Sequence, residues 1–162
     1  MRTNDRTKRN VSRAASHTDA RRGEMTKRNI HITSQDMDRL RKLLSNSRDP
    51  FGMDRPYLAT LQAELDRAKV VQPRGIEPDV VTMNSTVRVR DCDGSRTMVF
   101  TLVFPEHANP ETDHVSVIAP LGAALLGYRV GDRISFKVPA GTRTCEIVAV
   151  VYQPEAAGDL HL

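Results

Sequence analysis

The 162-residue chain lacks tryptophan, and its aromatic residues make up only 4% of the sequence. Aromatic side chains commonly line small-molecule pockets and form the platforms on which single-stranded bases stack. Their scarcity argues against both kinds of site. Long apolar runs are missing as well, so the sequence predicts neither a membrane-spanning segment nor a secretory leader in the first thirty residues.

Cysteine and the common catalytic motifs are equally scarce. Cys92 and Cys145 are too few for a disulfide framework or a thiolate zinc site, which favours a cytoplasmic protein with free thiols. The chain contains no GxxxxGK[ST], GxGxxG, HExxH or GxSxG motif, and its five histidines are scattered. Cys145 alternates with apolar residues and is expected in the core, whereas Cys92 falls in a turn and is expected at the surface. We therefore predict a protein that is not an enzyme and holds no metal or cofactor.

Positive charge is concentrated at the start of the chain. Residues 1–28 contain nine Lys and Arg against three Asp and Glu, whereas residues 29–162 contain fifteen against seventeen. Because this basic tail has almost no large apolar side chains, we expect it to be disordered. It could bind nucleic acid weakly and without sequence preference. The alternative is a solvated extension, with Met25 as a plausible natural start.

Residues 29–72 are predicted to form a short coiled-coil hairpin of two antiparallel helices. Thr33 and Ser34 are suitable N-cap residues for the first helix, where Asp36 suits the helix dipole, and Pro56 is suitable for the first turn of the second. The apolar residues recur at helical spacing: Met37, Leu40, Leu43 and Leu44, then Leu58, Leu61, Leu65 and Ala68. Each helix would be about 20 Å long, so the pair needs support from the rest of the chain.

The loop between these helices contains Asp49, Phe51 and Asp54. Its two carboxylates could hold a divalent cation. The interleaved Arg48 and Arg55 would compete as counter-ions, and turn formation or helix capping explains the aspartates without a metal.

Proline and glycine in residues 73–78 predict a linker, and residues 79–162 then form a second, β-rich domain. Apolar and polar residues alternate there in about five strands, which we expect to be antiparallel. A short helix is bracketed by Pro120 and Gly127. The predicted fold class is α+β, with a helical hairpin followed by a small antiparallel half-barrel.

Three segments of the second domain resemble a known family. They are DVVTMNS at residues 79–85, SVIAPLGAALLG at 116–127 with VGD at 130–132, and YQPEAAGD at 152–159. With them, the stretch from residue 29 to 162 resembles the Rnk family, the bacterial regulators of nucleoside diphosphate kinase. This family is in turn similar to the Gre transcript-cleavage factors, which combine an N-terminal coiled coil with an FKBP-like C-terminal domain.

The resemblance implies a protein that binds RNA polymerase at the rim of its secondary channel. Pro120 matches the proline of the Gre segment near the polymerase contact, and Ile118 and Ala119 replace the acidic and serine residues that precede it. With Leu121, these residues would form a more apolar polymerase-binding surface. A purely structural role in packing the strand end and helix start is the alternative.

Gre factors carry an acidic pair at the tip of a long coiled coil, where it helps to bind the second magnesium ion of the polymerase. Helices of about 20 Å would not deliver Asp49 and Asp54 that far. We therefore expect a monomer that competes with Gre factors without stimulating cleavage and affects the kinase indirectly, through transcription. The alternative is a true cleavage factor that uses these two aspartates. Prolyl isomerisation and direct contact with the kinase remain open to assay.

Overall fold

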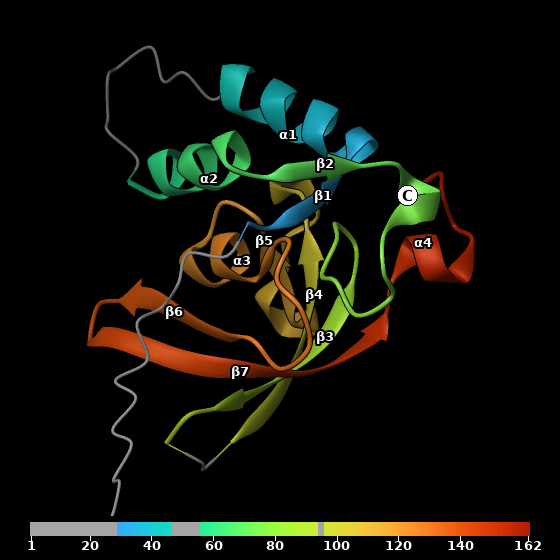
Figure 1. The fold of residues 1–162 in the computed structure, drawn as a ribbon. Coiled ribbons are helices and arrows are strands. Elements are labelled where there is room, and N and C mark those ends of the chain that lie inside the picture. Colours follow the sequence, from blue (N-terminus) through green and yellow to red (C-terminus); the bar gives the residue numbers. More distant parts are fainter. Residues whose placement is uncertain (1–28, 47–55, 94–95) are drawn as a thin grey trace, which may run out of the picture.

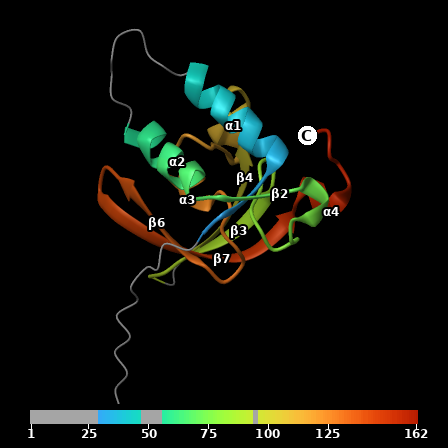
Figure 2. The same ribbon diagram turned by 45° about the horizontal axis from the view of Figure 1, so that its top comes forward.

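The computed structural model of the chain describes residues 29–46, 56–93 and 96–162 (Figure 1). Two helices and a two-stranded sheet lie on one side of a curved five-stranded sheet, and the short helix α3 (Pro120–Leu125) lies between them (Figures 1 and 2). The predicted α+β class with a half-barrel is confirmed. The basic tail and the loop residues Asp49, Phe51 and Asp54 lie outside the described residues.

The two N-terminal helices form close to where their sequence pattern predicts them. Helix α1 (Ser34–Asn46) begins after Thr33, whose Oγ1 accepts the N–H of Asp36 at 3.1 Å, as expected of an N-cap. Helix α2 (Pro56–Asp66) runs back alongside α1 (Figure 1). With 13 and 11 residues, the helices are about 20 Å and 16 Å long, the second somewhat shorter than expected.

Two short strands at the base of the helix pair were not predicted. Strand β1 (His31–Thr33) precedes α1, strand β2 (Lys69–Val71) follows α2, and the two pair in parallel with Ile32 opposite Val70. Three residues are too few to show a readable alternation, so the sequence carried no strand signal here. A 3₁₀ turn, η1 (Pro73–Gly75), follows β2. The division into two domains at residues 73–78 stays a prediction.

The five-stranded sheet has the order β5-β4-β3-β7-β6. Its strands are β3 (Thr86–Asp91), β4 (Thr97–Val103), β5 (His114–Ser116), β6 (Arg133–Val138) and β7 (Gly141–Tyr152). Strand β5 pairs in parallel with β4, which corrects the expectation of an antiparallel sheet throughout. The reason is the long connection between them, which contains the 3₁₀ turns η2 (Pro105–His107) and η3 (Pro110–Thr112) and lets the chain enter β5 in the direction of β4.

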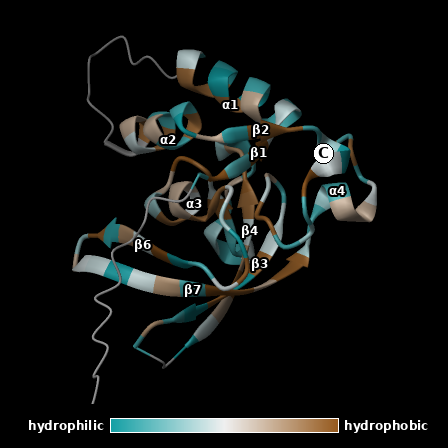
Figure 3. Ribbon diagram, viewed as in Figure 1, coloured by the Kyte–Doolittle hydropathy of each residue, from teal (hydrophilic) through white to brown (hydrophobic). Residues whose placement is uncertain are grey.

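One hydrophobic core joins the helix pair to the large sheet. Met37 and Leu40 of α1 and Leu61 and Leu65 of α2 belong to the same buried cluster as side chains from helix α3 and from the sheet. The sheet and α3 (Pro120–Leu125) contribute Val87, Val89, Leu102, Leu125, Ile134 and Ile147. Figure 3 shows the hydrophobic colours concentrated along the central strands and around α3. Among the described helices, none is both long and apolar enough to cross a membrane.

Gly127 is the point where β1 meets the β-rich part of the chain. Its carbonyl accepts the N–H of His31 at 3.2 Å, and its own N–H donates to the carbonyl of Val81 at 2.8 Å. Its φ is +77°, and a β-carbon built there would lie 2.6 Å from the Cβ of Ile30. Both the conformation and the close approach therefore require glycine.

Asp36 makes a second link between the helix pair and the β-rich part. Its Oδ2 accepts the backbone N–H of Met83 at 3.1 Å, and only 4% of the residue is exposed. Burial raises the pKa of the Asp36 carboxyl to about 6. The bond from Met83 and the charge of Arg39 oppose that rise, and the charge of Glu155 adds to it.

We predict that Gly127→Ala lowers the free energy of unfolding by about 2–4 kcal/mol, because the methyl group adds a steric conflict to an unfavourable φ. The matched control is Gly131→Ala. Gly131 has a φ of +89°, but a β-carbon there would meet no atom within 4 Å, so only the conformational cost of about 1–2 kcal/mol applies. Urea unfolding measures both variants, and equal losses would contradict the steric role of Gly127.

We predict that Asp36→Asn makes the protein more stable above pH 6 and leaves it nearly unchanged at pH 4. Because the folded pKa of about 6 exceeds the ordinary pKa of 3.8, stability falls as pH rises between these values. The full difference is about 3 kcal/mol, and a neutral amide oxygen still accepts the N–H of Met83.

Denaturant unfolding from pH 4 to pH 8 tests this prediction, with the exposed Asp38→Asn on the same helix as control. A constant stability difference between Asp36→Asn and the unsubstituted protein across this range would contradict it.

Candidate functional site

The four residues predicted to contact a partner form the turn that leads from β5 into α3. Ile118, Ala119, Pro120 and Leu121 are consecutive, and each is partly buried. Ala119 is extended, with φ −72° and ψ 153°, and Pro120 begins α3. Proline is favoured there because its fixed φ suits the first helical turn and its missing N–H is not needed.

Backbone contacts hold this turn in one shape. The N–H of Ala119 donates to the carbonyl of Ser116 at 2.9 Å, and the carbonyl of Ala119 accepts the N–H of Ala123 at 2.9 Å. Gly122 packs so closely on the end of β5 that a β-carbon would lie 2.0 Å from the carbonyl oxygen of Ser116. Because these contacts involve the backbone, the shape of the turn tolerates changes in the exposed side chains.

The side chains of the turn are apolar, which suits packing rather than catalysis. Ile118 and Leu121 pack partly against the core cluster, and none of the four side chains is ionisable. Such a partly exposed apolar turn can bind by packing, with part of its apolar area available to a partner. It offers no nucleophile or proton donor from its side chains.

The other predicted residues, Asp49, Phe51 and Asp54, fall in the connection between α1 and α2, outside the described residues. Their relation to the turn stays a prediction. Within residues 29–46, 56–93 and 96–162, no group of three or more His, Cys, Asp and Glu side chains is arranged to hold a metal ion.

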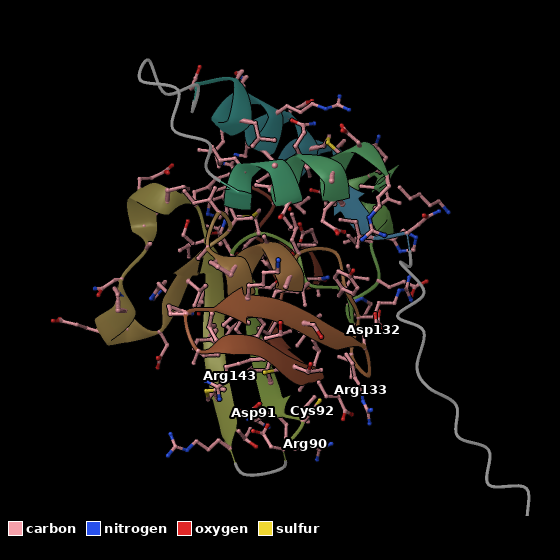
Figure 4. The ribbon with its side chains drawn as sticks, turned by 90° about the vertical axis from the view of Figure 1, so that its left-hand side faces the viewer. Arg90, Asp91, Cys92, Asp132, Arg133 and Arg143 are labelled. Atoms are coloured by element: carbon pink, nitrogen blue, oxygen red, sulfur yellow. The ribbon has the colours of Figure 1, made fainter. Side chains whose placement is uncertain are left out.

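An ion pair between the buried Asp91, at the end of β3, and the half-exposed Arg143 of β7 was not predicted (Figure 4). Asp91 is 3% exposed and pairs with Arg143, and its Oδ1 lies 3.9 Å from the Sγ of Cys145. Hydrogen bonds with Asp93 and Arg143 lower the pKa of Asp91, while burial raises the pKa of the Cys145 thiol. A buried, protonated thiol is a poor nucleophile. Cys145 thus lies in the core and Cys92 at the surface, as predicted.

An open groove of about 510 Å³ lies between α1, the start of η2 and the last residues of the chain. Arg39 spans it: one guanidinium nitrogen donates to the carbonyl of Leu162 at 2.6 Å, and the guanidinium carbon lies 5.6 Å from the ring centroid of Phe104. No local sequence pattern indicates this groove, because its walls come from four separate segments of the chain. The guanidinium of Arg39 is already engaged by these contacts within the chain.

Comparison with known proteins assigns both parts of the chain. Residues 28–71 match the family model described as Rnk N-terminus, and residues 76–152 match that of the transcription elongation factor GreA/GreB C-terminal region. The regulator of nucleoside diphosphate kinase from Escherichia coli K12 is 43% identical over 136 residues, which cover 83% of this chain and 98% of the relative.

Two further proteins match the chain. A solved structure described as a prokaryotic transcription elongation factor GreA/GreB from Nitrosomonas europaea is 41% identical, with a TM-score of 0.64, and covers 78% of this chain and all of that one. The transcription elongation factor GreA of Trichlorobacter lovleyi is 34% identical over 93 residues, which are 57% of this chain and 59% of the relative. The match to this GreA therefore leaves about two fifths of that protein uncovered.

Proposed function

Because the chain belongs to the Rnk family of regulators of nucleoside diphosphate kinase, we propose that it is a non-enzymatic transcription regulator that binds RNA polymerase near the secondary channel. The observation that carries this proposal is the match of residues 76–152 to the C-terminal region of GreA/GreB elongation factors. Polymerase is the partner on which proteins of that name act, and the shared domain would supply the contact.

The polymerase contact is assigned to the turn from Ile118 to Leu121. The resemblance to Gre factors implies that Pro120 lies near the polymerase contact. The turn is partly exposed, and its backbone is fixed by hydrogen bonds to Ser116 and Ala123. A preset shape favours binding because little conformational entropy is lost on docking. The apolar side chains of this turn favour packing over ion pairing with the polymerase.

The helix pair is assigned a role other than transcript cleavage. Helices α1 and α2 are about 20 Å and 16 Å long, and their apolar sides are buried against α3 and the sheet rather than held out into solvent. Divalent metal chemistry needs carboxylate oxygens within coordination distance of the ion. A short arm that lies on its own domain would leave the active centre of the polymerase unreached. The protein would then occupy the Gre site, compete with Gre factors and alter kinase levels through transcription.

A true cleavage factor is the second candidate, favoured by one observation: the connection between the helices contains two carboxylates, Asp49 and Asp54. In that case the two aspartates would help to hold magnesium at the active centre of the polymerase.

We predict that Pro120→Asp reduces retention on core RNA polymerase at least tenfold in a co-purification assay. The substitution places an uncompensated charge on an apolar contact, which is costly in an interface. The fold should persist, because an acidic residue at the first position of a helix is favourable. Excess Gre factor should likewise displace the unsubstituted protein.

Pro139→Asp is the matched control, since Pro139 is an exposed residue between β6 and β7, away from the turn. It should leave retention unchanged. Full retention of a folded Pro120→Asp variant would place the contact elsewhere on the protein.

We also predict that the protein leaves the rate of RNA hydrolysis unchanged in backtracked elongation complexes, and that it slows hydrolysis stimulated by a Gre factor. Gel analysis of the RNA products measures both effects. Faster hydrolysis that is lost in the double variant Asp49→Ala, Asp54→Ala would establish the cleavage factor instead.

A further inference from the structure

The outer face of the five-stranded sheet carries four exposed basic residues on two strands. Arg88 and Arg90 lie on β3, and Arg133 and Lys137 lie on β6. Strands β3 and β6 are the two neighbours of β7 in the sheet. Their neighbours along each strand, such as Val89 and Ile134, are buried, so the basic residues face away from α3 and the core. We call these four residues the basic sheet face.

The strand register places the four residues on one continuous surface. Glu146 of β7 lies opposite Arg90 on one side and opposite Arg133 on the other, so all three share a face. Figure 4 shows Arg90 and Arg133 at the same end of the sheet. With a rise of roughly 3.3 Å per residue and roughly 4.8 Å between strands, each basic group lies about 7 to 13 Å from the next, and the row from Arg88 to Lys137 is about 25 Å long.

The charge of this face differs from that of the chain around it. Residues 29–162 hold an excess of acidic residues, seventeen against fifteen basic ones. Of the residues that pair directly with the four basic ones across the strands, one is acidic, Glu146. It forms an ion pair with Arg90 at 3.1 Å. The basic sheet face therefore remains net positive, which is the complement of a polyanion.

Hydroxyl groups lie among the basic side chains. Thr86 and Thr101 are joined across β3 and β4 at 3.0 Å between their Oγ1 atoms, and Ser135 and Thr144 are joined across β6 and β7 at 2.9 Å. Hydroxyls and guanidinium groups are the donors that most often bind phosphate oxygens. The residues directly opposite the four cations are not aromatic: they are Thr97, Val99, Thr142, Glu146 and Ala149.

From this arrangement we propose that the basic sheet face binds the phosphodiester backbone of single-stranded nucleic acid. Guanidinium forks and the Lys137 ammonium neutralise phosphates, and the neighbouring hydroxyls donate to them. Without aromatic rings for stacking among these residues, the site does not discriminate between bases. A flexible single strand can follow the curved outer surface, whereas a stiff duplex touches it at few phosphates.

Fluorescence anisotropy of a labelled 20-nucleotide RNA of mixed sequence tests the proposal with the full chain and no polymerase. The sheet variant carries Arg88→Gln, Arg90→Gln, Arg133→Gln and Lys137→Gln. The control variant carries Arg41→Gln, Lys42→Gln, Lys69→Gln and Arg74→Gln, four exposed residues outside the large sheet. Both variants keep the basic tail and have the same net charge. A difference in RNA affinity between them therefore depends on which basic residues were replaced.

The sheet variant should bind at least tenfold more weakly than the unsubstituted protein at 50 mM salt, and the control variant within about threefold of it. The slope of log affinity against log salt should fall in magnitude by about 3 in the sheet variant, the value for loss of four phosphate contacts to a single strand. DNA of the same sequence as a single strand should bind similarly, and as a duplex more weakly. Equal losses in the two variants would mean that the tail or the net charge carries binding, and would overturn the proposal.

Glu146→Gln provides a second test that does not depend on the stability of a fourfold variant. It removes the acidic group between Arg90 and Arg133, so RNA should bind about two- to fivefold more tightly. Unchanged or weaker binding by this variant, or tighter binding of the duplex than of the single strand, would count against the site. Because polymerase is absent, neither result depends on the proposed function.

Discussion

The absence of a β-carbon at Gly127 determines how the base of the helix pair packs against the β-rich part of the protein. Because Gly127 has no side chain, Ile30 can approach its backbone and the N–H of His31 can bond to its carbonyl. The carbonyl of Ile30 in turn accepts the N–H of Lys69 at 2.8 Å, which aligns β2 with β1. Helix α1 starts directly after β1, and α2 ends shortly before β2. One close backbone contact therefore fixes the base of both helices.

The direction of the helices follows from a second link in the first turn of α1. There the buried Asp36 carboxylate accepts the N–H of Met83 and holds the start of the helix against the segment before β3. Beyond this point Met37, Leu40, Leu61 and Leu65 continue into the common core. Burial of these side chains requires the helices to lie across the β-rich part. An arm that projected freely would expose them to water.

Local rules account for the elements that the sequence predicted. Thr33 caps α1, Pro120 starts α3, and the alternation around Val87, Val89 and Ile134 identifies strands with one buried face. The start of α3 at Pro120 was predicted correctly, whereas the assignment of the turn from Ile118 to Leu121 as a binding surface stays a prediction. The local sequence pattern of the turn does not predict which partner it binds.

Features that depend on contacts between distant residues escaped prediction. The position of Asp36 in the first helical turn predicts only an interaction with the helix dipole. In the structure its carboxyl is buried and accepts the N–H of Met83, which is 47 residues away in the sequence. The β1–β2 pair exists only because the helices return the chain to its starting point, and the parallel β5 depends on the path of the loop before it. Each of these is set by tertiary structure rather than by periodicity.

The two proposed surfaces lie at different places around the five-stranded sheet. The turn from Ile118 to Leu121 follows β5, one edge of the sheet, whereas the basic sheet face lies on β3 and on β6, the opposite edge. Helix α3, which begins at the turn, covers the inner face, and the basic residues point away from it. A protein partner that binds only at the turn would thus leave the basic residues open to solvent. A strand of nucleic acid held there would add its binding energy to the protein contact, since the second of two linked contacts forms at high effective concentration.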